Sequence, residues 1–414
     1  MAITSSFPEI ADRPESQPAG LLVVLTPLSP EGLERTISNL AAAFPGTMIR
    51  VATPDPIPPD ISELPQFRAL TYTPVAPSTG GWLLTAADFL NSYKLVQEHG
   101  TNGCLLLGPE AQSIDPDALA ALGSALLSGS ADLGVARYAL GPRDGLVNSA
   151  ILYPATRSLF GTKARYPLAI DLAISRRMGE RLATAAQKFT ASGQNAGLLW
   201  PVSEAASAGM SIAEVEIGTR AIPVPDSADL NTILAHVAGS LFADIEAKAS
   251  FWQRARMAYS PKAAAPHTQV TGTNKENLAT ADSPDIQPML ESFRLAYSNL
   301  HEIWSLVLPP NSLLGLKKLS LMPPAIFRMP DALWARIVYD FILAYRLRTI
   351  NRGHLMGALT PLYLAWVASH LRLSSAGGGE RLSPEAHVES LAGAFEVDKP
   401  YLVSRWRWPD RFNP

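Results

Sequence analysis

Two short runs of purely apolar residues constrain the fold more than any other feature. Residues 21–25 read Leu-Leu-Val-Val-Leu, and residues 104–107 read Cys-Leu-Leu-Leu. Apolar runs this short, without polar alternation, are typical of strands buried on both faces of a parallel sheet. Helical periodicity over 31–43 and 85–97, with a further strand at 48–52, indicates strand–helix alternation. The sequence therefore predicts an α/β domain of βα units.

Further elements follow the same alternation up to a change of composition. The pattern predicts helices over 116–127, 172–191 and 230–255 and a late strand over 215–218. Residues 259–285 then contain almost no large apolar side chain, which is typical of a linker.

Beyond the linker, apolar residues recur at helical spacing. Leu333, Ile337 and Phe341 share one face of a predicted helix. We therefore expect a disordered N-terminus (1–19), an α/β domain (20–258), the linker (259–285) and an all-α C-terminal domain (286–414).

Composition excludes several classes of protein. Lys and Arg total 34 against 37 Asp and Glu, so the net charge of -3 gives none of the basic field that nucleic-acid binding needs. The single cysteine, Cys104, excludes a disulfide framework and is expected to be a small buried strand residue.

The first residues lack the pattern of a signal peptide, which favours the cytoplasm. The apolar stretch 355–371 is interrupted by Pro361 and shorter than the roughly 20 residues of a membrane span, so we expect a buried helix.

Two groups of segments carry a resemblance to a known family. The first group comprises Asp144-Gly145-Leu146-Val147-Asn148, residues 153–161 and residues 165–175, and the second comprises residues 334–341, 359–364 and 399–403. Their order and spacing resemble the bacterial mannosylglycerate-synthase-like glycosyltransferases. Those proteins pair a GT-A-type, Rossmann-like domain with a helical C-terminal domain. The resemblance implies transfer of a hexose from a GDP- or UDP-sugar to a small hydroxylated acceptor.

The same resemblance implies a divalent metal, Mg²⁺ or Mn²⁺, which bridges the diphosphate of the donor. The family carries an Asp-x-Asp motif after the strand that ends near Leu107. This chain has Gly108, Pro109 and Glu110 there, so Glu110 is the one remaining carboxylate for a metal. A metal-ligating histidine and an acidic residue of the family correspond to Ile222 and Leu198, which cannot coordinate a cation.

Other positions that match the family are candidates for the acceptor side. Asp171 and Asp144 are the candidate catalytic residues. The alternative for Asp171 is a helix N-cap, and for Asp144 a turn aspartate. The candidate substrate-binding residues are polar or cationic and could hold an anionic acceptor: Arg137, Tyr138, Asn148 and Arg165.

Three functional hypotheses follow from these residues. The first is a glycosyltransferase that binds a nucleotide sugar and a small acceptor, with no nucleic-acid partner and no transmembrane segment. The second is a catalytically inactive paralogue with a scaffold or regulatory role, because several metal-site groups are lost together. The third is a metal-independent transferase in which Lys163, Arg165 or Arg220 takes the charge of the leaving group. The sequence leaves a homo-oligomer open.

Overall fold

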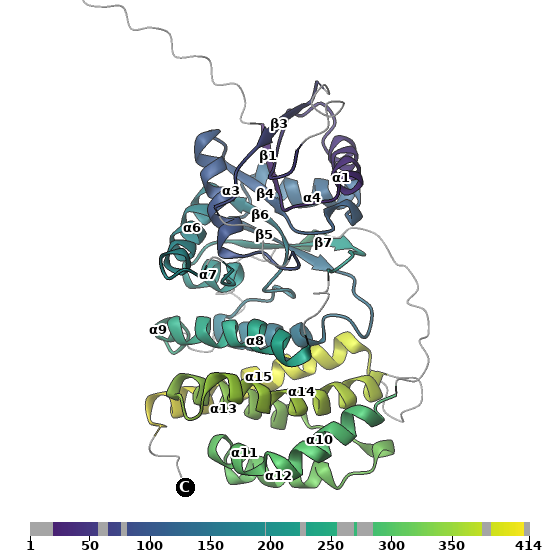
Figure 1. The fold of residues 1–414 in the computed structure, drawn as a ribbon, viewed down its shortest axis with the longest axis vertical. Helices are drawn as coiled ribbons and strands as arrows, with labels where there is room; N and C mark the ends of the chain where they lie inside the picture. The colour runs from purple at the N-terminus through teal and green to yellow at the C-terminus, as the bar shows by residue number, and fades with distance from the viewer. Residues whose placement is uncertain are drawn as a thin grey trace, which may run out of the picture.

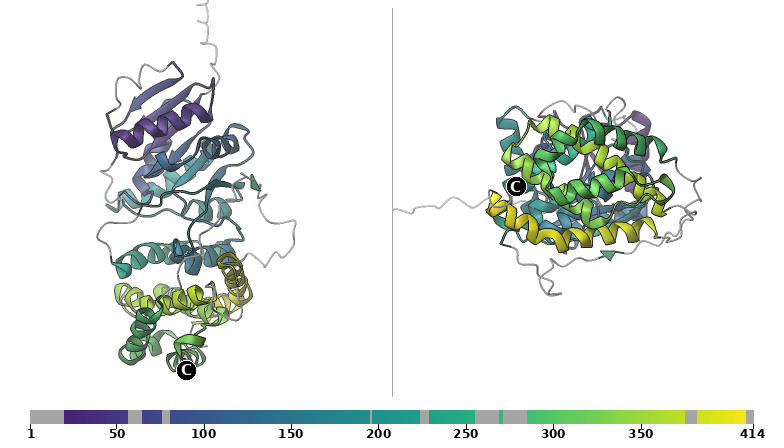
Figure 2. Two further views of the ribbon diagram at one scale, coloured as in Figure 1. Left: turned by 90° about the vertical axis from the view of Figure 1, so that its right-hand side faces the viewer. Right: turned by 90° about the horizontal axis from the view of Figure 1, so that it is seen from below.

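The fold is described from a computed structural model of the chain. The described residues are 20–56, 65–75, 81–194, 196–223, 229–254, 269–270, 285–374 and 382–409. Figure 1 shows a sheet with flanking helices stacked on a helical part, and Figure 2 shows the same two parts from the side and from below. The predicted N-terminal segment and nearly all of the predicted linker lie outside the described residues, so the domain boundaries stay predictions.

A mixed sheet forms the first part. In the described residues its order is β3-β2-β1-β4-β6-β5-β7-β8, and only β6 runs antiparallel to its neighbours. The two apolar runs form β1 and β4 at its centre and are buried along their whole length, as predicted. The strands are β1 (Leu21–Leu25), β2 (Ile49–Thr53), β3 (Phe67–Thr71), β4 (Gly103–Leu107), β5 (Leu133–Tyr138), β6 (Asp171–Ser175), β7 (Ile212–Gly218) and β8 (Gln269–Val270).

Helices cover both faces of this sheet. One pair, α1 and α4, packs together on one face, and α3 packs against α6 on the other (Figure 1). Ser29 begins the first helix, because its side chain accepts a hydrogen bond from the Gly32 backbone amide. The helices are α1 (Pro30–Ala43), α3 (Ala86–Glu98), α4 (Pro116–Leu127), α5 (Tyr153–Phe160), α6 (Arg176–Ala191) and α7 (Pro201–Ser207).

The first residues of one predicted helix form a strand instead. The helix expected over 172–191 begins only at Arg176, and its N-cap is Ser175, whose hydroxyl accepts from the Met178 amide. Asp171 is instead the first residue of β6, so the N-cap alternative for Asp171 is wrong. A three-residue apolar run fits either a strand or a helix, and here strand pairing with β4 and β5 decided it.

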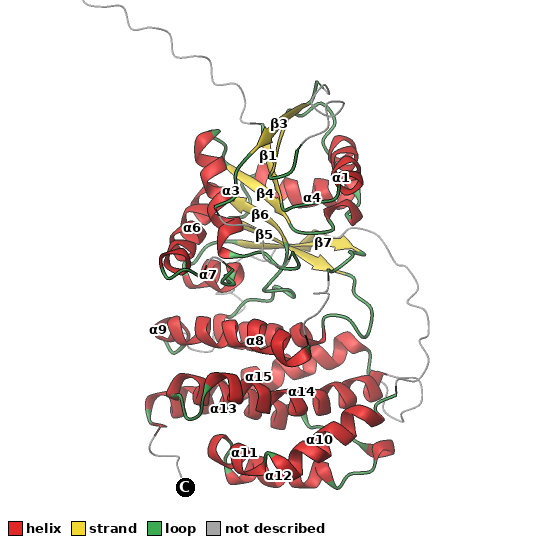
Figure 3. Cartoon of the chain, viewed as in Figure 1, coloured by secondary structure: helices red, strands yellow, loops and turns green. Residues whose placement is uncertain are grey.

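The second part is helical (Figure 3). Its core also takes in side chains of α5 and α8, which precede the predicted linker. Large aromatic residues fill this core. The apolar stretch around Pro361 forms a buried helix, α14, as predicted. Its helices are α8 (Leu230–Ala247), α9 (Ala249–Trp252), α10 (Gln287–Asn299), α11 (His301–Val307), α12 (Pro310–Ser320), α13 (Asp331–Leu347), α14 (Arg352–Ser374) and α15 (Pro384–Arg407).

These elements confirm the predicted fold class in its general form, an α/β domain with a mostly parallel sheet followed by a helical C-terminal part. Within the described residues, no helix combines the length and apolar character needed to cross a bilayer.

The last turn of α13 supplies a first testable prediction. Arg348 is exposed and adopts the left-handed conformation (φ 53°) that ends this helix. Glycine takes this conformation without the steric cost that a side chain incurs, at the expense of more backbone entropy in the unfolded chain. We expect Arg348→Gly to raise the free energy of unfolding by about 0.5–1 kcal/mol, measured by urea denaturation. A lower stability than wild type would contradict this reasoning.

Candidate functional site

Asp171 and the loop after β4 lie side by side. Because β6 pairs antiparallel with β4, Asp171 lies opposite Leu107. The Gly108 backbone amide donates a hydrogen bond of 3.2 Å to Asp171 Oδ1. The structure therefore brings together the candidate catalytic acid Asp171 and the loop at Gly108–Glu110, where the related family carries its Asp-x-Asp motif.

The space between them is filled by Arg220. Its Nε and Nη2 donate to the two oxygens of Asp171, at 3.0 and 3.1 Å. Its Nη2 and Nη1 also donate to the backbone oxygens of Pro109 (2.6 Å) and Glu110 (2.5 Å). The side chains of Arg220 and Asp171 are both 0% exposed. A guanidinium thus occupies the place where a cation would meet this loop.

The end of β7 delivers Arg220 to this place. Gly218 ends β7 with φ 70°, a left-handed conformation that glycine adopts readily. Two residues later the chain reaches the loop after β4. Sequence reasoning identified Arg220 only by its proximity in sequence, because nothing in the sequence indicates which carboxylate it meets.

The residues around Glu110 do not fit a divalent metal. The Glu110 carboxylate is exposed and accepts a hydrogen bond from Gln112 Nε2 at 2.6 Å. Ile222 is 39% exposed and Leu198 is buried in the core of the helical part, so neither offers a ligand. Among the described residues, no cluster of three or more His, Cys, Asp or Glu side chains could hold an ion. Divalent cations in proteins need several oxygen or nitrogen ligands.

Gly108 stands at the first position of the family's Asp-x-Asp motif, and close packing against Ile170 leaves no room for an aspartate side chain there. A Cβ atom built at Gly108 would lie 2.8 Å from both Cβ and the backbone oxygen of Ile170. The loop after β4 is therefore packed too closely for an aspartate at this position without a backbone shift.

Tyr138 belongs to the same buried cluster. Its hydroxyl donates to Asp171 Oδ2 at 3.2 Å and accepts from the Ile170 amide at 2.9 Å. Burial and the neighbouring Asp171 carboxylate raise the pKa of Tyr138 well above its usual value, and Arg220 only partly opposes this. The phenol therefore stays neutral and serves as a hydrogen-bond donor, rather than as a base.

An open cavity lies beside this closed cluster. Its volume is about 930 Å³, and it lies between the ends of β5 and β7 and the first turn of α15. Four of the candidate residues line it, together with Tyr166, Glu216, His370 and Glu385: Arg137, Tyr138, Asp144 and Arg165. A β-bulge between Arg137 and Tyr138 marks the place where β5 reaches this cavity.

The other candidate residues lie outside the lining of this cavity. Glu110 and Asp171 are not among the described residues that form it. Asn148 is buried, and its side-chain amide donates to the Arg165 backbone oxygen at 3.0 Å.

Asp144, which does line the cavity, also has the contact that the turn alternative predicts. Its carboxylate accepts a hydrogen bond from the Gly141 amide at 3.2 Å.

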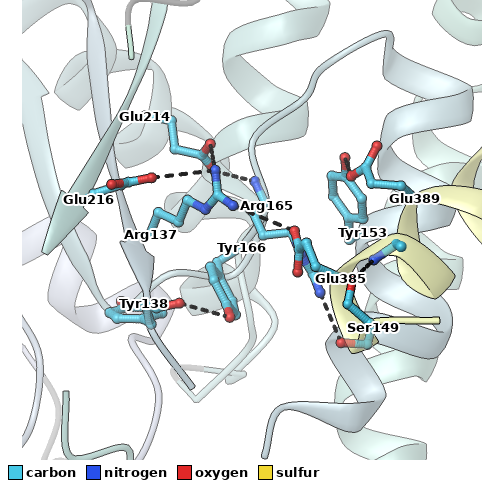
Figure 4. A network of polar contacts seen from close by, with 12 residues as sticks. Arg137, Tyr138, Ser149, Tyr153, Arg165, Tyr166, Glu214, Glu216, Glu385 and Glu389 are labelled. Atoms are coloured by element: carbon cyan, nitrogen blue, oxygen red, sulfur yellow. Dashed lines mark hydrogen bonds and ion pairs between the residues drawn. The ribbon is translucent and has the colours of Figure 1, made fainter. Parts of the chain in front are cut away.

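Carboxylates surround the two arginines of the cavity (Figure 4). Arg137 lies within 3.9 Å of Glu214, 3.7 Å of Glu216 and 3.5 Å of Glu385. Arg165 Nε lies 3.3 Å from Glu385. Burial raises the pKa of Glu214, although the Arg165 amide and the Arg137 guanidinium act in the opposite direction.

Sequence reasoning missed these three glutamates. Glu385 belongs to the helical part and lies 220 residues from Arg165 in the sequence. No local pattern could have indicated this contact, because it depends on how the two parts pack.

Comparisons with known proteins give a limited result. No family model matches the chain, and no curated protein matches it. Among solved structures, the chain is similar to three structures of the glucosyl-3-phosphoglycerate synthase from Mycobacterium tuberculosis. The complex with phosphoglyceric acid is 15% identical with a TM-score of 0.34, and the match covers 55% of this chain and 79% of that one.

The second structure of that synthase has 16% identity and a TM-score of 0.32, over 55% of this chain and 80% of the other. The third, with Mn²⁺, UDP-glucose and phosphoglyceric acid, has 15% identity and a TM-score of 0.31, over 55% and 79%. Similarity at this level carries no argument about function.

Proposed function

We propose that this chain is a catalytically inactive protein of the glycosyltransferase type, which retains a ligand cleft and acts by binding. The observation that carries the proposal is the Arg220 guanidinium, which joins Asp171 to the backbone oxygens of Pro109 and Glu110. A metal-dependent transferase needs that space for a cation that neutralises the departing diphosphate. A scaffold or regulatory role is the function left to such a chain.

Arg220 is also a poor substitute for the metal. Its Nη1 donates to Ser113 Oγ (3.1 Å) and to the Ala221 backbone oxygen (2.8 Å), in addition to its contacts with Asp171 and the loop. Every nitrogen of the guanidinium therefore already has an acceptor within the protein. An arginine that stabilises a leaving diphosphate must direct free N–H groups at it. This argues against Arg220 as the group that replaces the metal in a metal-independent transferase.

A second candidate function is transfer of a hexose from a GDP- or UDP-sugar to a small hydroxylated acceptor. The observation that favours it is the open cavity, where Arg137, Arg165 and Asp144 are gathered at the end of β5. For this activity the Arg220–Asp171 pair would have to separate when the donor binds. Breaking a buried ion pair costs several kcal/mol, on the order of 3–5, which the donor would have to supply.

A turnover assay separates the two candidates. The wild-type protein is incubated with a panel of GDP- and UDP-sugars, with Mg²⁺, with Mn²⁺ or with EDTA, and release of nucleoside diphosphate is measured. We expect no release above that of a protein-free control under any of these conditions. Calorimetry with the same panel measures binding independently of turnover.

Either of two results would overturn the proposal. A rate that needs Mn²⁺ or Mg²⁺ and falls in Glu110→Gln would show a working metal site. A rate that persists in EDTA would show metal-independent transfer. Glu98→Gln, an exposed glutamate at the end of α3, is the matched control, because it removes the same charge from the surface.

A further inference from the structure

Two arginines from the sheet part converge on one carboxylate from the helical part. Arg137 Nη2 lies 3.5 Å and Arg165 Nε 3.3 Å from the same oxygen, Glu385 Oε1. Arg137 belongs to β5, Arg165 precedes β6, and Glu385 lies in the first turn of α15 (Figure 4). All three side chains line the cavity described above.

Arg165 is held in place without Glu385. Its Nη2 donates to Ser149 Oγ at 3.1 Å. Its guanidinium carbon lies 4.8 Å from the centre of the Tyr153 ring and 5.5 Å from that of Tyr166, within the range of cation–π contacts. The arginine is therefore a fixed cation, which would keep its position if the Glu385 carboxylate moved away.

One donor of Arg165 is left over. The side chain is 8% exposed, and its Nη1 is buried without a hydrogen-bond partner among the described residues. A buried donor without a partner costs free energy, so such groups in native proteins call for an explanation. Arg165 thus keeps an unpartnered guanidinium nitrogen while its side chain lines the cavity.

Glu385 is the one member of this group that is free to leave. Its side chain is 51% exposed, against 28% for Arg137 and 8% for Arg165. It shares a single oxygen between two arginines, without the paired contacts of a bidentate ion pair. A half-exposed carboxylate can turn into water at little cost, because solvent replaces its partners.

Charge disfavours an anion in this cleft while Glu385 occupies it. Three carboxylates, Glu214, Glu216 and Glu385, lie within 3.9 Å of Arg137, so carboxylates already surround the place that an anion would take. An incoming anion is repelled while the Glu385 carboxylate stays there. Once it leaves, the two groups that it contacts, Arg137 Nη2 and Arg165 Nε, are available to an anionic ligand.

We propose that Glu385 is an internal anion that occupies a binding site for a small carboxylate or phosphate group, and that a ligand binds by displacing it. The proposal rests on the proposed function only in that both assign ligand binding to this cleft. Glu385 then sets the affinity of the site.

The test removes the charge of Glu385 and measures anion binding. Wild-type protein and Glu385→Gln are titrated by calorimetry with inorganic phosphate and, separately, with acetate at constant ionic strength. We expect Glu385→Gln to bind at least one of these anions about tenfold more tightly than wild type, since a like charge has gone. Phosphate alone, acetate alone or both would each support the proposal and indicate the ligand group.

Two further variants serve as controls for this titration. Glu389→Gln removes the same charge one turn along α15, where the carboxylate contacts Arg157 and Tyr153, and we expect it to bind as wild type does. Arg165→Met in the Glu385→Gln background should abolish the gain, with the fold checked by the melting temperature.

An affinity of Glu385→Gln no higher than that of wild type overturns the proposal. So does an equal gain in Glu389→Gln. Turnover of a sugar nucleotide would overturn the proposed function and leave the phosphate and acetate titrations to decide this inference by themselves.

Discussion

Replacing Arg220 with methionine is expected to lower the free energy of unfolding by about 3–5 kcal/mol, because it leaves an unpaired charge in the interior. Asp171 is 0% exposed, and Arg220 contacts both of its oxygens. The same substitution removes the Arg220 donor to the Pro109 backbone oxygen, and the Glu110 backbone oxygen keeps its two donors from Ser113. Methionine fills a similar volume. The lower free energy of unfolding therefore comes from the lost charge and hydrogen bonds more than from a cavity.

Urea denaturation followed by circular dichroism measures this effect. Arg177→Met is the matched control, because Arg177 is 64% exposed in its ion pair with Asp132. Exposed pairs of this kind contribute less than about 1 kcal/mol. The double variant Asp171→Asn with Arg220→Met should recover part of the loss, since no charge then remains buried. Equal losses in Arg220→Met and Arg177→Met would show that the buried pair does not hold this loop.

The second large effect is a loss of stability in acid caused by a buried histidine pair. His370 Nδ1 and His387 Nδ1 lie 2.7 Å apart, and His387 Nε2 lies 3.0 Å from Asp331 Oδ1. Burial and, to a lesser degree, the charges of His387 and Arg165 lower the pKa of His370 to about 3, although Asp331 acts in the opposite direction. His370 therefore stays neutral in the folded protein at pH values where it is protonated in the unfolded chain.

The sign of the pH dependence follows from this difference. Below the unfolded pKa of 6.5 the unfolded chain binds a proton that the folded chain does not, so stability present above 6.5 is lost as the pH falls toward 3. Between pH 6.5 and about pH 4 the loss amounts to roughly 3 kcal/mol. Burial acts to raise the pKa of Asp331, but its hydrogen bonds with His387 and Ser390 outweigh this and leave the pKa lowered, so Asp331 adds a loss of the same sign at lower pH.

Melting temperatures between pH 7 and pH 4 measure this prediction. His370→Asn keeps a side-chain donor near His387 and has no titrating ring, so its stability should change less over this range than that of wild type. His301→Asn, at an exposed position in α11, should retain the full wild-type dependence. An unchanged pH profile in His370→Asn would show that other groups cause the acid loss.

The site shows where sequence reasoning succeeded and where it failed. The missing carboxylate at Gly108 and the lone Glu110 could be read directly, because a side chain that is absent from the sequence is absent from the fold. Asp171 lies beside the loop after β4, and its N-cap alternative is wrong. Two charged residues four apart on α13 also find their partners on α15: Arg336 pairs with Asp398, and Asp340 with Arg405.

The sequence by itself determined the alternation of strands and helices and the helical C-terminal part, because short apolar runs and helical periodicity report on burial residue by residue. The two apolar runs lie in β1 and β4 and are fully buried there. Only the tertiary structure decided which charges meet. Arg220 reaches Asp171 from 49 residues away, and Glu385 reaches Arg165 from 220 away. A charged side chain forms its pair after the chain has packed, so the partner depends on the fold and leaves no local pattern in the sequence.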